Sequence, residues 1–244
     1  MRSSNPVFKE SIYEQAYPLT ERPMTAAGTM NKLLILSLVM MLGAGAVYYQ
    51  FFLGHIDFVS MLVTGGIIAG FILGLVAIFN IKLMPYLAPL YAFSQGAALS
   101  GISCFFEQSF PGIVIQAVSM TFIVVFVMAV LYKAGLIQAT EKFRSIVFTA
   151  SMAIMIFYII AFVLSFFHVN VPYFYVNSPL NIGINIAIAI IAALNLIIDF
   201  DFIEQGVRKP LPSLYEWHGA FGLLVTILWL YIEILRILAR TRRR

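Results

Sequence analysis

The sequence is poor in charged residues. Only 11% of its 244 residues are Asp, Glu, Lys or Arg, whereas 61% are hydrophobic and the mean hydropathy is +0.95. A soluble domain has about a quarter of its residues charged, which it needs to cover its surface. The composition therefore excludes a water-soluble protein and predicts an integral membrane protein in contact with the lipid bilayer.

Cysteine is almost absent as well. The single Cys104 excludes an internal disulfide and a metal site built from cysteines. Of the 15 basic residues, ten lie in the N-terminal segment and the connections between apolar runs, and five lie at the C-terminus. That distribution is typical of membrane topology signals and predicts no nucleic-acid partner. The first 30 residues are polar and mixed in charge, which does not fit a secretory signal peptide.

Long apolar runs fill the rest of the chain. A helix of about 20 apolar residues spans a bilayer, and the runs lack the alternation of barrel strands. The predicted fold is an all-α bundle of seven transmembrane helices in one domain, 31–240, between a polar N-terminal segment, 1–30, and a basic tail, 241–244. The predicted spans lie near residues 33–53, 59–79, 87–106, 112–132, 146–167, 180–200 and 217–238.

Lysine and arginine set the expected orientation. The N-terminal segment and the second, fourth and sixth connections contain ten of them, whereas the first, third and fifth connections contain none. Since cytoplasmic loops are enriched in these residues, the N-terminus is predicted to be cytoplasmic. The arginines from Arg236 onward conflict with a seventh crossing, which would place them outside. Either this tail is tolerated there, or the last segment does not cross fully.

Small residues recur along the first three predicted spans. Glycine at a helix surface allows two helices to approach closely. We therefore expect close helix contacts at Gly43, Gly45, Gly65, Gly66, Gly70, Gly74, Gly96 and Gly101.

Polar side chains form a stripe along the sixth predicted span. At about 100° per residue, its members fall within an arc of roughly 80°. Such a stripe should face the bundle interior or a wet cavity rather than lipid. It consists of Asn181, Asn185, Asn195 and Asp199. Asp201 lies about 200° from Asp199, facing either the headgroups or back toward the protein.

The last predicted span has a second seam, which contains two small residues and an acid. Gly219, Gly222, Thr226 and Glu233 fall within roughly 60°, with Glu216 at the edge. This face should pack tightly against another helix, for which the sixth span is the candidate. In an antiparallel pair, Asp199 is level with Glu216, whereas Glu233 lies about 25 Å further along the axis.

Carboxylates in a membrane protein can serve proton and cation chemistry. Two of them a few ångströms apart cannot both ionise at low cost, so the pair shares a proton and responds to pH. Their oxygens also suit a hard cation such as Ca²⁺. The alternative, a structural interpretation, is that these acids have only structural roles. In it, Asp199 and Asp201 mark a solvated helix end, and Glu233 pairs with Arg236 one turn on.

Several segments are similar to those of a known family. They are MTAAGTMNK, YAFSQGAALSGIS followed by FFE, GIVIQAVSMTF, LNLIIDFDFIEQG and YEWHGAFGLLVTILWLYIEILRILA, spread over residues 24–239. In their order and spacing they resemble the Bax inhibitor-1/YccA family, in a bacterial branch. The resemblance implies a bundle whose last helix is central and a location in the bacterial cytoplasmic membrane. It also implies a pH-sensitive Ca²⁺ leak gated by one acid on the sixth helix and one on the seventh.

The resemblance identifies the sixth-helix acid more clearly than the seventh-helix acid. Asp199 or Asp201 matches the sixth-helix position. The stretch WLYIEIL places the seventh-helix acid at Glu233, whereas alignment from YEWH or from the final ILA places Val225 or Thr226 there and leaves no acid. A re-entrant last segment, as in one model of the family, would return the arginine-rich tail to the cytoplasm.

The leading functional hypothesis is a pH-sensitive Ca²⁺ leak channel. Its gating and cation-binding residues would be Asp199, Asp201, Glu216 and Glu233, with Ca²⁺ held by Asp199 and Glu233 and no cofactor required. The alternative is a regulatory partner of a membrane protease or stress-response complex, docked through the polar N-terminal segment. No buried histidine or nucleophile pattern indicates an enzyme.

Overall fold

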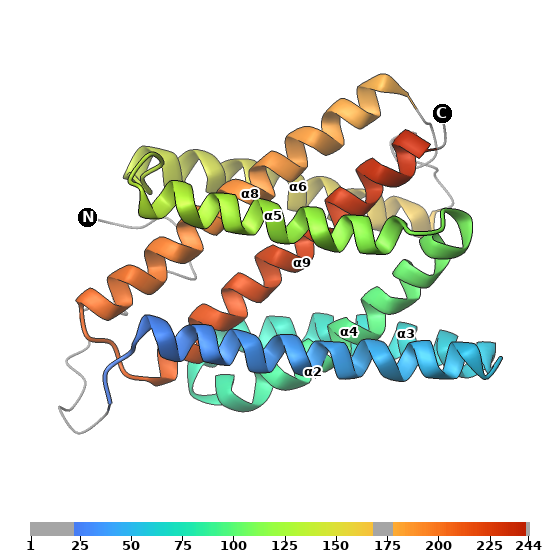
Figure 1. Ribbon diagram of the computed structural model, residues 1–244, viewed down its shortest axis with the longest axis horizontal. Coiled ribbons are helices and arrows are strands. Elements are labelled where there is room, and N and C mark those ends of the chain that lie inside the picture. Colours follow the sequence, from blue (N-terminus) through green and yellow to red (C-terminus); the bar gives the residue numbers. More distant parts are fainter. Residues whose placement is uncertain (1–21, 168–177, 243–244) are drawn as a thin grey trace. The chain divides into compact units, whose positions relative to one another are not determined.

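Helices make up nearly all of the structure, a computed structural model that describes residues 22–167 and 178–242. The fold is all-α, as predicted, and each of the seven predicted spans corresponds to one helix. The helices are α2 (Ala26–Phe52), α3 (Ile56–Phe79), α4 (Met84–Ser109), α5 (Ile113–Lys133), α6 (Glu141–Phe166), α8 (Pro179–Arg208) and α9 (Leu214–Arg242), with a short 3₁₀ helix η2 (Ile81–Leu83) (Figure 1).

Several boundaries differ from the sequence prediction, and the largest differences are in α2, α6, α8 and α9. Helix α6 begins at Glu141 rather than near residue 146, and α8 continues to Arg208 rather than ending near residue 200. Helix α2 begins at Ala26 rather than near residue 33, because Thr25 caps it by accepting a hydrogen bond from the Gly28 N–H. Helix α9 continues to Arg242, so the first two residues of the predicted basic tail are helical. Residues 1–21 of the predicted N-terminal segment and residues 243–244 of the tail lie outside the described residues.

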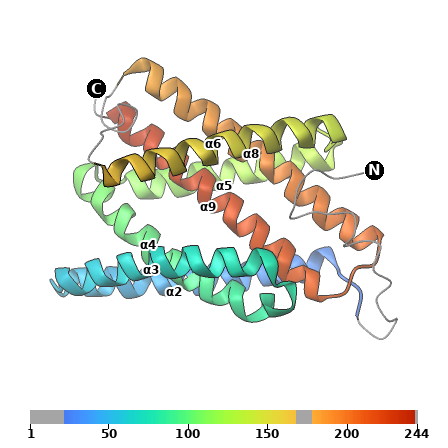
Figure 2. The ribbon, with the colours of Figure 1, turned by 180° about the vertical axis from the view of Figure 1, so that it is seen from behind.

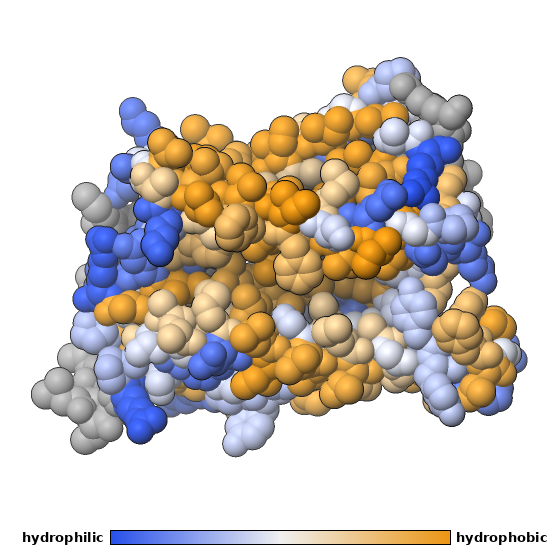
Figure 3. Space-filling view, viewed as in Figure 1, coloured by the Kyte–Doolittle hydropathy of each residue, from blue (hydrophilic) through white to orange (hydrophobic). Residues whose placement is uncertain are grey.

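Six of these helices are long and apolar enough to cross a membrane. The exception is α4, whose mean hydropathy is lowered by residues such as Ser94, Gln95 and Ser100. Apolar side chains lie along the lengths of the helices, and hydrophilic ones gather toward helix ends (Figure 3). In α8 and α9, 50% and 56% of the most apolar window is buried, against at most 22% in the other candidate spans. Such burial is what the expected central position of the last helix requires.

The chain forms two compact units. The first contains residues 1–111 and 201–225, and the second contains residues 112–200 and 226–244, so α8 and α9 contribute to both. In the first unit, α4 lies beside both α2 and α3 (Figures 1 and 2). In the second unit, polar contacts join α6 to α8 and to α9.

Glycines bring the helices of the first unit into backbone contact. A Cβ atom at Gly43 of α2 would overlap the Phe93 carbonyl group of α4. On α3, a Cβ atom at Gly66 would lie 2.6 Å from the Ser94 carbonyl oxygen, also on α4. Backbones can approach this closely only where no side chain stands between them.

The expected glycine contacts are therefore confirmed for most positions but not for all. Close neighbours from another helix meet Gly43, Gly66, Gly70, Gly74, Gly96 and Gly101. The prediction is wrong for Gly45 and Gly65, where an added Cβ atom would meet nothing within 4 Å.

Adjacent glycines on α3 provide a test of this packing. We expect Gly66→Ala to destabilise the protein by about 1–3 kcal/mol, because the new methyl group overpacks the contact with α4. Gly65→Ala should be neutral or stabilise by up to about 1 kcal/mol, because alanine favours a helix. Thermal unfolding of both variants in the same detergent checks the prediction, and equal melting temperatures would contradict it.

Candidate functional site

The polar stripe of α8 lies in the protein interior. Asn181, Asn185 and Asp199 are buried, and Ile188 and Ala192, which lie between them on the same face, are buried too. Asn195, the remaining member of the stripe, is half-buried. That this face avoids lipid stays a prediction, which the burial of the other three members favours.

Asp199 stands at one end of this stripe, and its hydrogen-bonding partner comes from α9. The Thr226 hydroxyl donates to the Asp199 carboxylate. The other carboxylate oxygen, Oδ2, is buried and has no hydrogen-bond partner among the described residues. One side of the carboxylate is thus held, while the other can accept a proton, a donor or a cation.

Asn195 connects the same stripe to α6. Its Nδ2 donates to the Ser151 hydroxyl at 2.8 Å and to the Ile191 carbonyl oxygen at 2.8 Å. These bonds fix the side chain one turn before Asp199. The Asn195 amide is therefore tethered at two points rather than free to rotate.

Glu233, the other acid proposed to pair with Asp199, has different partners. Its Oε1 accepts hydrogen bonds from the Tyr158 hydroxyl at 2.9 Å and from Arg236 Nη1 at 3.1 Å. Arg236 also donates to the Tyr158 oxygen at 2.8 Å, which closes a three-membered network. The ion pair with Arg236 that the structural interpretation expected is present. Its other oxygen, Oε2, is buried and has no hydrogen-bond partner in the part of the chain that the structure describes.

Position along α9 keeps Glu233 away from Asp199. Thr226, which contacts Asp199, precedes Glu233 by seven residues, about 10 Å along the helix axis. The structure thus places a threonine opposite Asp199, as the alignment without a seventh-helix acid expects. The prediction that Asp199 is level with Glu216 is wrong, because Thr226 follows Glu216 by ten residues, about 15 Å along the axis of α9. Asp201 turns to its own helix, where its Oδ2 accepts a 2.7 Å hydrogen bond from Gln205.

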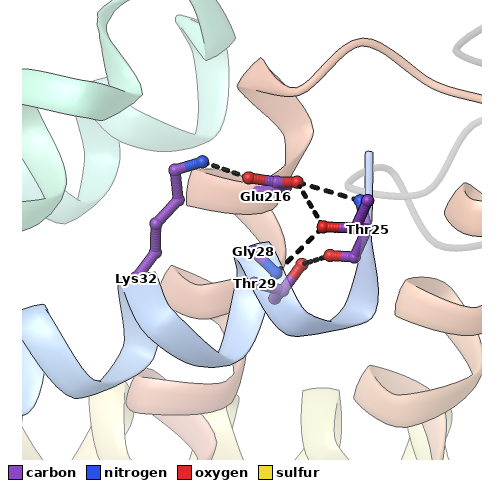
Figure 4. A network of polar contacts seen from close by, with 5 residues as sticks. All are labelled: Thr25, Gly28, Thr29, Lys32 and Glu216. Carbon is purple, nitrogen blue, oxygen red and sulfur yellow. Dashed lines mark hydrogen bonds and ion pairs between the residues drawn. The ribbon is translucent and has the colours of Figure 1, made fainter. Parts of the chain in front are cut away.

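Glu216 is bound at the start of α2 (Figure 4). Its Oε1 accepts hydrogen bonds from the Thr25 backbone N–H at 2.9 Å and from the Thr25 hydroxyl at 3.0 Å. Its Oε2 forms an ion pair with the Lys32 ammonium group, which also lies over the Trp217 ring. The carboxylate is buried, so these three donors replace its lost hydration.

Backbone hydrogen bonds also join residues 22–24 to the turn that precedes Glu216. Met24 N donates to the Leu211 carbonyl at 2.6 Å, and Ser213 N donates to the Arg22 carbonyl at 2.8 Å. These bonds flank an antiparallel bridge between Pro23 and Pro212. Residues 22–24 are thus paired with the turn between α8 and α9.

The sequence indicated the acids and the Arg236 partner of Glu233, but not the other partners. The expectation that no histidine is buried is wrong for His218, whose side chain is buried near the start of α9. Thr25, Lys32, Ser151 and Tyr158 went unnoticed as contributors, because each is separated from its acid or amide by at least 44 residues of sequence. Only the helix-capping pattern beginning at Thr25 carried a local signal. Among the described residues, no group of three or more His, Cys, Asp or Glu side chains could hold a metal ion.

These helices, with carboxylates buried in the last two, define an all-α integral membrane protein. A family model described as Bax inhibitor 1 like matches residues 5–243. The chain therefore belongs to the Bax inhibitor 1-like family, which confirms the family resemblance of its sequence motifs. Searches among curated proteins and among solved structures find no match to the chain.

The Glu233 network should contribute to stability. We expect Glu233→Gln to destabilise the protein by about 1–3 kcal/mol, because it removes the charge that Arg236 and Tyr158 bind in a buried place. The matched control is Glu204→Gln, which removes an exposed ion pair with Arg208 and should cost less than about 1 kcal/mol. Thermal unfolding in detergent compares the two. A Glu233→Gln melting temperature no lower than that of the control would contradict the structural role.

Proposed function

We propose that this membrane protein is a cation-handling channel, a pH-sensitive Ca²⁺ leak in which Asp199 is the proton- and cation-binding group. The single observation that carries the proposal is a buried carboxylate with one oxygen unpartnered among the described residues, at the end of an asparagine stripe in which Asn181 and Asn185 are buried and Asn195 is half-buried. Carboxylates are rare within membrane helices because they are costly there, so they mark ion or proton pathways.

The chemistry of this face suits both ligands. A carboxylate oxygen is a preferred ligand of Ca²⁺, and amide and hydroxyl oxygens can complete its shell. The Thr226 hydroxyl is already in contact with Asp199, and the asparagine stripe supplies further polar groups on the same face of α8. Protonation of Asp199 would remove the charge that attracts the cation. We therefore propose that protons and Ca²⁺ compete at one carboxylate rather than at an acid pair.

The other acids receive different roles in this proposal. Asp201 bonds within its own helix, Glu216 is bound by Thr25 and Lys32, and Glu233 is bound by Tyr158 and Arg236. Glu233 has a tethered arginine where the hypothesis from sequence placed Ca²⁺. We thus assign cation binding to Asp199 alone, and no catalytic step to any residue.

The distribution of basic residues supports a topology for the proposal. We place the N-terminus in the cytoplasm and the protein in a bacterial cytoplasmic membrane, following the lysine and arginine bias of the connections. The alternative function, a regulatory partner of a membrane protease or stress-response complex, depends on the polar N-terminal segment. Residues 1–21 of that segment lie outside the described residues.

Flux in liposomes tests the leak. Purified protein is reconstituted with a Ca²⁺-sensitive dye inside the vesicles, and Ca²⁺ entry is followed at several pH values. We expect a flux that changes with pH in the wild type and loses this dependence in Asp199→Asn, because the amide cannot bind the proton. Asp201→Asn, two residues further on the same helix, is the matched control and should keep the dependence.

Two results would overturn the proposal. One is a wild-type flux equal to that of protein-free vesicles at every pH. The other is a pH dependence in Asp199→Asn that equals the wild type.

A further inference from the structure

The contact between Glu216 and the start of α2 is built like a helix cap whose carboxylate comes from another helix. In an ordinary capping box, the first-turn Glu at the third helical position reaches back to the N–H of the capping residue. Here Thr25 is the cap and the third position is Gly28, and α2 has no acidic residue in its first turn. Glu216 of α9 supplies the missing carboxylate to the Thr25 N–H.

The glycine at the third position is what admits this foreign carboxylate. A Cβ atom built at Gly28 would overlap both oxygens and the carboxyl carbon of Glu216. Any side chain there would push Glu216 away from Thr25. The contact therefore depends on a glycine, a threonine and a lysine within eight residues of α2, all directed to one acid that is 184 residues distant from Lys32 (Figure 4).

A second, uncharged attachment holds the same two parts of the chain together. The backbone of residues 22–24 pairs with the turn between α8 and α9. The Met24 side chain is 1% exposed. A Cβ atom at Gly206 of α8 would lie 2.7 Å from its sulfur, and one at Gly219 of α9 would lie 3.5 Å from its methyl carbon. Residues 22–32 thus tie the beginning of α2 to the beginning of α9, and we call them the N-terminal strap.

We propose that the N-terminal strap holds the leak in a low-conductance state and that release of Glu216 from Thr25 and Lys32 raises it. The inference rests on the proposed function. Helix α9 is continuous from Leu214 to Arg242, so a movement of its first turn reaches Thr226, about 15 Å further along the axis. Thr226 is the residue that holds Asp199. The strap is the attachment that joins the first turn of α9 to α2.

The contact is suited to release. Its charged part consists of one ammonium and one carboxylate whose side chains are 18% and 8% exposed, so a change at the surface can reach it. The three donors come from residues 25–32, so a displacement of this one segment affects all of them.

Two glycines of α2 provide the test. Gly28→Ala displaces Glu216 without altering any charge, whereas Gly45→Ala adds the same methyl group to the same helix where nothing lies within 4 Å. In the liposome assay at fixed pH, we expect Gly28→Ala to raise the Ca²⁺ leak roughly five- to tenfold, the shift in a two-state equilibrium that the loss of a helix cap produces. Gly45→Ala should leak at the wild-type rate.

A cross-link distinguishes an effect on gating from misfolding of the variant. Arg22→Cys with Ser213→Cys, in a Cys104→Ser background, places two thiols across the antiparallel bridge. Neighbouring strand positions lie about 4.5–5.5 Å apart between Cα atoms, within the range of a disulfide. Oxidation should return the leak of Gly28→Ala to the wild-type level, and reduction should raise it again. A merely misfolded variant would not regain the low leak.

Each outcome decides the matter. A leaking wild type with equal rates in Gly28→Ala and Gly45→Ala overturns the strap and leaves the proposed function standing. The strap is also overturned if the oxidised cross-link leaves Gly28→Ala fast, or if the cross-link does not form in the Gly45→Ala variant. A wild type without any leak overturns the proposed function and with it the gating role.

Discussion

A carboxylate that is removed from water must find donors within the protein, and this requirement organises the last two helices. Only 11% of the residues are charged, yet three of the acids, Asp199, Glu216 and Glu233, are buried. Each meets the requirement differently. Glu216 receives a backbone N–H, a hydroxyl and an ammonium; Glu233 receives a phenol and a guanidinium; Asp199 receives one hydroxyl.

These differences separate structural acids from a functional one. A buried carboxylate with a nearby cation and several donors is held in one state, because removal of either partner leaves an unpaired charge. Glu216 and Glu233 are in that situation. Asp199 and Glu233 each have one oxygen without a partner among the described residues, but Glu233 has the Arg236 guanidinium beside it, whereas the partner described for Asp199 is a single hydroxyl. A group that is only partly satisfied is the one whose state a proton or a cation can change at least cost.

Much of the fold follows from the sequence, because the bilayer restricts the solutions so strongly. Only helices and closed barrels span a bilayer, and long apolar runs without strand alternation fit helices. A polar stripe on such a helix is expected to face inward. Packing details do not follow in the same way. Gly65 and Gly66 are adjacent and chemically identical, but only Gly66 meets α4, and one residue of helix rotation decides which. The partner of Asp199 was ambiguous for a similar reason: alignments differing by two turns of α9 place either Glu233 or Thr226 opposite it.

The attachment at Glu216 shows a different limit. The start of α2 lacks the acidic residue that usually completes a capping box. Its capping threonine is followed by Ala26, Ala27 and Gly28, with no acid in the first turn. The positive end of a helix favours a negative charge nearby, so a carboxylate from elsewhere in the chain is the natural complement. Nothing in the sequence says which carboxylate it is, because the answer depends on the turn between α8 and α9 lying beside residues 22–24. A gap in a local capping pattern can therefore point to a long-range contact, and the fold determines which residue completes it.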